Sequence, residues 1–171
     1  MFRFALISAV CCAMVAPVVF ADVLVPPGYE LVEVTNTPYP ELHAAMNNRG
    51  QIVFEGRLAG WDGSELFLYD TDGSLTRLTD DNVWDGVPQI SDDGTIVWSK
   101  EIGGGGTEEI MVRSPNGEVT RLTFNDLDDH APHINNLGQI AWERWTDRGC
   151  GATDVLFYDG QTIRQLTDNL V

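Results

Sequence analysis

The 171-residue sequence predicts an all-β protein built from three copies of a four-stranded antiparallel unit. Short apolar segments alternate with glycine-containing turns, and no segment shows a sustained helical periodicity. The pattern of turns and strands returns every 44 residues. Four short strands in a repeat of this length form the unit of a β-propeller blade.

Turn glycines mark the period at Gly50, Gly94 and Gly138, and each is followed by an apolar strand. A tight hairpin needs a positive φ at this place, which glycine adopts without strain. Leucine–threonine pairs at 78–79, 122–123 and 166–167 keep the same spacing. The repeats are therefore structural units and not a compositional bias.

Each repeat is predicted to contain an inner strand, a strand covered on both faces, a third strand and a polar outer strand. The inner strands are expected at 44–47, 87–91 and 131–135, and the second strands centre on 52–54, 96–98 and 140–142. The third strands are ELFLYD, EIMVRS and DVLFYD, and the outer strands are LTRLT, VTRLT and IRQLT. The blades are expected at about 41–80, 85–124 and 129–168, after one leading outer strand at 30–35.

The segment LTDDNVWDGVPQISDDGTIVWSKEIGGGGTEEIMVRSPNGEVTRLT, residues 78–123, resembles the blade of the TolB-like β-propeller family. The resemblance extends over the chain from residue 22 onward, although Ala44 stands where later repeats have Pro88 and Pro132. It implies a propeller fold and says little about function. Closed propellers have about four to eight blades, so we expect an incomplete ring. Either the chain is a fragment or two copies close one ring as a homodimer.

Residues 1–21 are expected to be a signal peptide, with one early charge at Arg3, an apolar run and cleavage after Ala21. Residues 22–171 would then form a secreted or periplasmic partial propeller. Cys11 and Cys12 lie in a poor lipoprotein signal, which leaves a lipid anchor as the less favoured alternative. Cys150, the cysteine left after cleavage, is expected to be an unpaired loop thiol.

The formal net charge of −16 argues against nucleic acid and anionic membranes as partners, because both would be repelled. No segment is suited to span a membrane once the leader is set aside. An acidic surface leaves room for divalent cations. Calcium is therefore the one cofactor that we consider.

Acidic residues at the entry to each inner strand, Glu41, Asp85 and Asp129, occupy equivalent positions. They are expected to accept hydrogen bonds from loop backbone N–H groups. The alternative is calcium binding, since closely spaced carboxylates suit a hard cation. The candidate metal ligands are Asp85, Asp126, Asp128 and Asp129, although none of these segments has the full spacing of an EF-hand loop.

Tryptophans divide into two groups by position. Trp98 and Trp142, on the second strands, are expected in the core between blades. Trp61, Trp84 and Trp145 are expected in loops on one face, where they could stack on sugars. His130 and His133 are further ligand-binding candidates, although an extended segment directs residues three apart to opposite faces.

These features favour an exported, noncatalytic propeller module that binds protein or carbohydrate and that calcium could stabilise. No residue is assigned as catalytic. The alternatives are a fragment of a propeller-type polysaccharide lyase or hydrolase, with His130, His133 and flanking acids at its site, and a nonfunctional remnant. Three blades alone would not surround a central site, which weakens the enzyme hypothesis.

Overall fold

A computed structural model describes residues 2–6, 26–57, 63–81, 83–104, 106–146 and 151–168. All regular secondary structure in these ranges is β-strand, which confirms the all-β prediction. Within the same ranges, no helix has the length and apolarity needed to cross a membrane.

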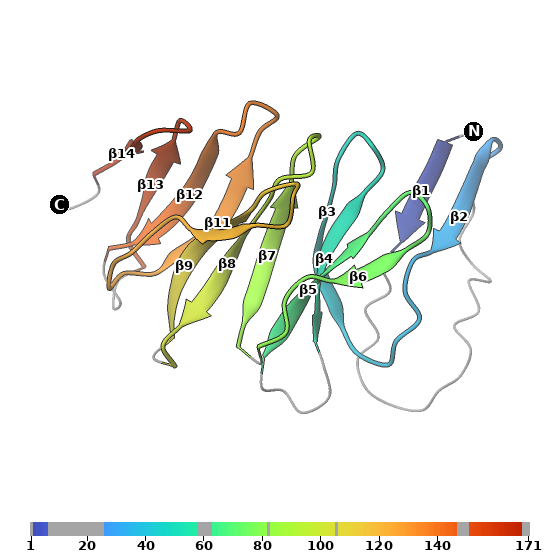
Figure 1. The fold of residues 1–171 in the computed structure, drawn as a ribbon, viewed down its shortest axis with the longest axis horizontal. Helices are drawn as coiled ribbons and strands as arrows, with labels where there is room; N and C mark the ends of the chain where they lie inside the picture. The colour runs from blue at the N-terminus through green and yellow to red at the C-terminus, as the bar shows by residue number, and fades with distance from the viewer. Residues whose placement is uncertain are drawn as a thin grey trace.

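Three four-stranded antiparallel sheets stand side by side in chain order, and across the described residues they do not close into a ring (Figure 1). The first blade contains β3 (Glu41–Met46), β4 (Ile52–Arg57), β5 (Ser64–Tyr69) and β6 (Leu75–Arg77). The second contains β7 (Asp85–Ile90), β8 (Ile96–Ile102), β9 (Thr107–Arg113) and β10 (Val119–Arg121). The third contains β11 (Asp129–Ile134), β12 (Ile140–Trp145), β13 (Thr153–Tyr158) and β14 (Ile163–Gln165). Three propeller blades in an incomplete ring are thus confirmed.

A separate two-stranded sheet precedes the blades. It pairs β1 (Phe2–Leu6) in parallel with β2 (Tyr29–Glu33). β2 overlaps the expected leading strand, whereas β1 lies inside the segment that the sequence assigns to a signal peptide. The parallel pairing differs from the antiparallel partner that an outer blade strand would have. Among the described residues, β2 therefore has no antiparallel neighbour of the kind that the third strand of a blade would provide.

The hydrophobic core consists of two layers, one at each junction between blades. Val53, Leu66, Ile96 and Trp98 meet between the first and second blades. The second layer joins Val97, Ile110, Ile140, Trp142 and Leu156. Alternate residues of β8 therefore point into different layers, as expected for a strand covered on both faces. Trp98 and Trp142 are each 2% exposed, which confirms their predicted core positions.

Hairpin turns between the first two strands of each blade also join neighbouring blades. Asn48, Asp92 and Asn136 are equivalent residues of these turns, and hydrogen bonds link each to the next. We call this chain of contacts the turn ladder. It gives the Asn-Asn and Asp-Asp turns a role that glycine placement alone does not explain.

The repeated leucine–threonine pairs fasten the end of each outer strand to the third strand. The threonine hydroxyl oxygen accepts a backbone N–H of that strand in every blade. The pairs are Leu66 N to Thr79 (3.0 Å), Ile110 N to Thr123 (2.9 Å) and Val155 N to Thr167 (2.8 Å). This contact explains why the motif persists where the strand itself is exposed.

Candidate functional site

The predicted metal ligands Asp85 and Asp129 are fully buried, and each accepts hydrogen bonds from a tryptophan and a basic side chain. The Trp98 indole donates to Asp85 at 2.5 Å, and Lys100 Nζ lies 2.9 Å from its other oxygen. Burial raises the pKa of Asp85 to about 6, although Lys100 and Trp98 lower it. These contacts differ from the backbone capping that the sequence suggests.

Asp129 repeats this arrangement with arginine in place of lysine. The Trp142 indole donates to it at 2.8 Å, and Arg144 donates to both carboxylate oxygens at 2.7 and 2.8 Å. The Asn125 amide adds a fourth hydrogen bond. A guanidinium that bridges both oxygens is a strong and geometrically specific partner for a carboxylate.

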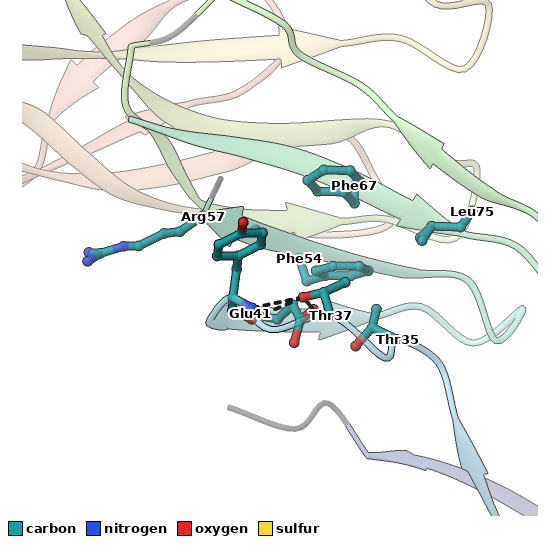
Figure 2. Close-up of a pocket in the computed structure, with 9 residues that line it drawn as sticks. Thr35, Thr37, Glu41, Phe54, Arg57, Phe67 and Leu75 are labelled. Carbon is teal, nitrogen blue, oxygen red and sulfur yellow. Dashed lines mark hydrogen bonds between the residues drawn. The ribbon is translucent and has the colours of Figure 1, made fainter. Parts of the chain in front are cut away.

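Glu41, the equivalent residue of the first blade, lacks both kinds of partner. Phe54 stands in place of the tryptophan, and Gly56 stands in place of the basic residue. Thr37 donates its hydroxyl to Glu41 at 2.6 Å. Figure 2 shows the pocket beside this pair, with Phe54 and Phe67 along its wall and the Arg57 side chain extending away. Phe54 and Phe67 stack with their ring centroids 5.7 Å apart.

Asp128 and Asp126, the other candidate calcium ligands, lie in the loop before β11. Asp128 accepts the backbone N–H of Glu108 at 3.2 Å, and Asp126 is exposed. Burial, followed by the negative charges of Asp128 and Glu101, raises the pKa of Glu108 to about 7. The negative charges of Asp128, a predicted ligand, and of Glu101 thus act on the Glu108 carboxylate.

A second acidic group lies at the junction of the first and second blades. Glu65, Asp81 and Asp85 bring carboxylate oxygens within 4.8 Å of one another. Lys100 bonds both Asp81 and Asp85, so its ammonium supplies positive charge where a metal ion could. A cation at this group would have to compete with the lysine.

His130 and Trp145, two predicted ligand-binding residues, lie together on the third blade. The Trp145 indole N–H donates to His130 Nε2 at 3.0 Å, and the ring centroids are 5.6 Å apart. Glu143 Oε2 lies 3.6 Å from the same nitrogen. Trp145 remains 36% exposed. We call these three residues the His130–Trp145 surface.

The other predicted ligand-binding residues lie elsewhere. His133 is exposed, and no hydrogen bond or ion pair within the described ranges joins it to His130. Trp84 is half-buried, and its ring lies over Gly86, where an added Cβ would come within 2.3 Å of it. Trp84 therefore packs at the junction of the first two blades. Trp61 lies outside the described residues.

Comparisons with known proteins show what this arrangement of blades is similar to. No family model and no curated protein matches the chain. Among solved structures, a TolB from Agrobacterium tumefaciens matches with a TM-score of 0.64 at 21% identity, covering 84% of this chain and 55% of that one. A TolB from Acinetobacter baumannii matches with a TM-score of 0.57 at 22% identity, covering 73% and 32%. The fold is that of a TolB-like β-propeller.

Part of a peptidase chain matches the same arrangement of blades. Dipeptidyl peptidase 4 from Porphyromonas gingivalis matches with a TM-score of 0.59 at 16% identity, covering 75% of this chain and 18% of that one. The chain thus spans about half the length of the Agrobacterium TolB and about a third of the Acinetobacter TolB. The TolB-like fold alone therefore does not decide between binding and catalysis.

Each inner strand of this TolB-like propeller carries a bulge that the sequence did not reveal. His43, Val87 and Ala131 are equivalent, and their φ angles are 50°, 51° and 51°. The strand register shifts around each of them. Left-handed backbone at a β-branched residue such as Val87 is strained. Non-glycine residues in this region give no turn signal in a sequence.

The first bulge presents a histidine that is not among the predicted site residues. His43 Nδ1 lies 2.8 Å from Glu55 Oε2, and the histidine side chain is half exposed. Glu55 is fully buried, and its Oε1 has no hydrogen-bond partner among the described residues. A buried carboxylate that orients an accessible imidazole is an arrangement suited to binding or to proton transfer.

Proposed function

We propose that the chain is an exported, noncatalytic β-propeller module that binds a glycan or protein partner through the His130–Trp145 surface. The observation that carries the proposal is the contact between Trp145 and His130, which holds an exposed indole in one orientation. Glu143 lies beside it with its side chain 53% exposed. An oriented aromatic face next to a carboxylate suits a sugar ring or an amphipathic side chain.

The hydrogen bond from Trp145 also restricts the tautomer that the neutral imidazole can adopt. His130 Nε2 accepts the indole N–H, so the proton of the neutral ring is on Nδ1. Nδ1 is buried and has no partner among the described residues. A ligand that moves the Trp145 ring would free Nε2 and allow the imidazole to change tautomer. Binding should therefore alter both tryptophan emission and histidine chemical shifts.

The test is a titration of intrinsic tryptophan emission with a panel of oligosaccharides, followed by a peptide-display library. Trp145→Ala should abolish the response. Leu137→Ala, at an apolar residue that is 82% exposed, is the matched control and should leave it unchanged. A full response from Trp145→Ala would contradict the proposed surface, and silence of the wild type in both panels would contradict the binding function.

Calcium stabilisation is the second part of the proposal. It is supported by the hydrogen bond from the Glu108 backbone N–H to Asp128 and by the negative charges of Asp128 and Glu101 near the Glu108 carboxylate, which a divalent cation would offset. Equilibrium dialysis with calcium at millimolar concentration should retain ion in the wild type and less in Asp128→Asn. Absence of retained calcium would contradict this part and leave the binding surface untouched.

Export and assembly complete the proposal. Export is supported by the leader-like sequence of residues 1–21, and N-terminal sequencing of the mature protein should find Asp22 first. Two three-blade arcs could close one ring, and light scattering should then give a discrete dimer of residues 22–171. A monomer that aggregates would instead indicate exposed blade edges.

A polysaccharide lyase or hydrolase fragment is the alternative function. It is favoured by the His43–Glu55 pair, because a buried carboxylate that orients an imidazole can support general base catalysis. Cleavage of a polysaccharide that disappears in His43→Gln and in His133→Ala, with the fold intact by circular dichroism, would promote this alternative.

A further inference from the structure

The pocket of the first blade is the place where the repeat departs from its own pattern. In the second and third blades, the carboxylate at the start of the inner strand receives an indole N–H and a basic side chain from within the chain. In the first blade, Phe54 and Gly56 supply neither. Glu41 is nonetheless 6% exposed, so its carboxylate is largely withdrawn from water.

Glu41 therefore lacks the ion pair that Asp85 and Asp129 have in the other two blades. Its described polar partner is the Thr37 hydroxyl, and no ion pair joins it to a basic side chain within the described ranges. A buried carboxylate is stabilised by a positive partner with good hydrogen-bond geometry. Arg57 also lines the pocket, but its side chain extends away from Glu41 (Figure 2), so the first blade retains the acid of the repeat without the ion pair.

The same pocket contains a second buried polar group, the hydroxyl of Thr35. Thr35 is 7% exposed, and its hydroxyl oxygen has no hydrogen-bond partner among the described residues. Thr35 lines the pocket together with Glu41, Phe54, Phe67 and Leu75 (Figure 2). The equivalent threonines Thr79 and Thr123 each accept a backbone N–H. An acceptor without a donor therefore lies near the acid that lacks its cation.

We propose that this pocket binds an alkylguanidinium or alkylammonium group, presented as the arginine or lysine side chain of a protein partner. The third blade supplies the template, since Arg144 meets Asp129 through two hydrogen bonds beside an aromatic ring. The cation would bind Glu41, a further N–H would reach Thr35, and the aliphatic stem would contact Phe54 and Leu75. The cavity beside Glu41 has a volume of about 60 Å³ and is lined mainly by apolar side chains, which suit the aliphatic stem of arginine or lysine.

This site is distinct from the His130–Trp145 surface and does not depend on it. Phe54 is equivalent to Trp98, which packs against the preceding blade, so a second copy that closed the ring would cover the pocket and exclude the cation. The strongly acidic chain would attract a basic partner and raise its rate of association. Because the equivalent positions of the other blades are filled by their own lysine and arginine, the first blade is the described blade able to accept a cation from outside.

The first test titrates the protein with a blocked Gly-Arg-Gly peptide, n-butylguanidinium and n-butanol, with backbone amide chemical shifts as the readout. Saturable shifts at Thr37, Gly56 and their neighbours are expected with the two cations. The peptide should bind more tightly than the free ion if a protein side chain is the natural ligand. Binding of n-butanol as tight as that of n-butylguanidinium would overturn the role of charge. Absence of saturable shifts with the peptide would overturn the proposal.

Variants locate the site. Glu41→Gln should weaken the binding of n-butylguanidinium by about ten-fold or more, since a charge-assisted contact is lost. Glu118→Gln removes one charge from an exposed hairpin and is the matched control, with unchanged binding expected. Equal binding by Glu41→Gln and the wild type would contradict the assignment.

A variant that refills the pocket tests the internal comparison. The triple substitution Phe54→Trp, Gly56→Lys and Phe67→Met copies Trp98, Lys100 and Met111 of the second blade. Phe67 must change because a Cβ on Gly56 would lie 2.8 Å from its ring. The refilled blade should be folded and no longer bind the cation. A folded triple variant that binds like the wild type would also overturn the proposal.

Discussion

Asn48 donates its backbone N–H and its side-chain amide to the two carboxylate oxygens of Asp92, at 2.9 and 2.8 Å. The residues are 44 positions apart, so one repeat contacts the same turn of the next. Asn136 continues the pattern, because its amide donates to Asp92 at 2.6 Å and its own oxygen accepts the Asp92 backbone N–H at 2.8 Å. Asp92 is thus bonded to the blades on both sides.

Asp92→Ala should lower the thermal midpoint by a few degrees, because it removes the acceptor that both neighbouring turns share. Differential scanning calorimetry measures the change. Asp72→Ala is the matched control, since Asp72 accepts from Ser74 within a single outer turn. An effect no larger than that of Asp72→Ala would show that the turn ladder does not couple the blades.

The stabilisation from Asp92 should also depend on pH. Hydrogen bonds from Asn48, and then from Asn136, lower the pKa of Asp92 below its usual value of 3.8. The contribution is therefore present above the unfolded pKa and is lost as pH falls through the folded pKa. The wild type and Asp92→Ala should converge in stability in acid, as followed by urea denaturation at several pH values.

Asp129→Asn should destabilise the fold by about 3 kcal/mol, because Arg144 loses its ionic partner in a mostly buried pair. Chemical denaturation measures the loss, and calcium should not restore it. Glu118→Gln, at an exposed residue of the hairpin between β9 and β10, is the control and should have little effect. Full rescue of Asp129→Asn by calcium would indicate a metal-binding role instead.

Glu108→Gln should stabilise the protein above neutral pH and have little effect near pH 4. Burial raises the folded pKa of Glu108 to about 7 from 4.5, so the folded state binds more protons between these values. Its contribution to stability is therefore lost as pH rises through that window. Solvent screening limits the gain to about 1 kcal/mol at pH 8. A pH-independent difference in the unfolding free energy would contradict the shift.

Gly86→Ala should destabilise by about 2 kcal/mol, since the added methyl group would overlap the Trp84 ring and Glu55 Oε2. Trp84→Ala in the same chain should remove part of that clash, so the two effects should not add. Urea denaturation of the double-mutant cycle measures the coupling. Strict additivity would show that Trp84 does not pack on Gly86 in solution.

The sequence predicted the blades well because their signals are local and repeated. Glycine turns, three-residue apolar runs and the leucine–threonine pairs each recur at one spacing, and β8 follows its predicted two-faced pattern. The bulges at His43, Val87 and Ala131 could not be predicted in this way. A positive φ is expected from glycine, and here the surrounding sheet imposes it on other residues.

The candidate site was predicted less completely. Trp145 and His130 were both identified, but their contact depends on the register of β11 against β12 beyond the bulge. Asp85 and Asp129 were identified as important acids, while their pairing with Lys100 and Arg144 depends on side chains across the sheet. The His43–Glu55 pair and the pocket beside Glu41 arise where residues of the first blade differ from the equivalent residues of the other two blades. Their consequence depends on contacts between strands, which the sequence does not give.

The turn ladder implies an uneven cooperativity of unfolding. Asp92 has a bonded neighbour on each side, whereas Asn48 and Asn136 are each bonded through the ladder to one described blade. In a chain of units coupled to nearest neighbours, melting the middle unit uncouples its two neighbours from each other. Hydrogen exchange should therefore find the outer blades opening independently and the second blade opening only with the whole array. The second blade would then set the kinetic lifetime of the folded chain.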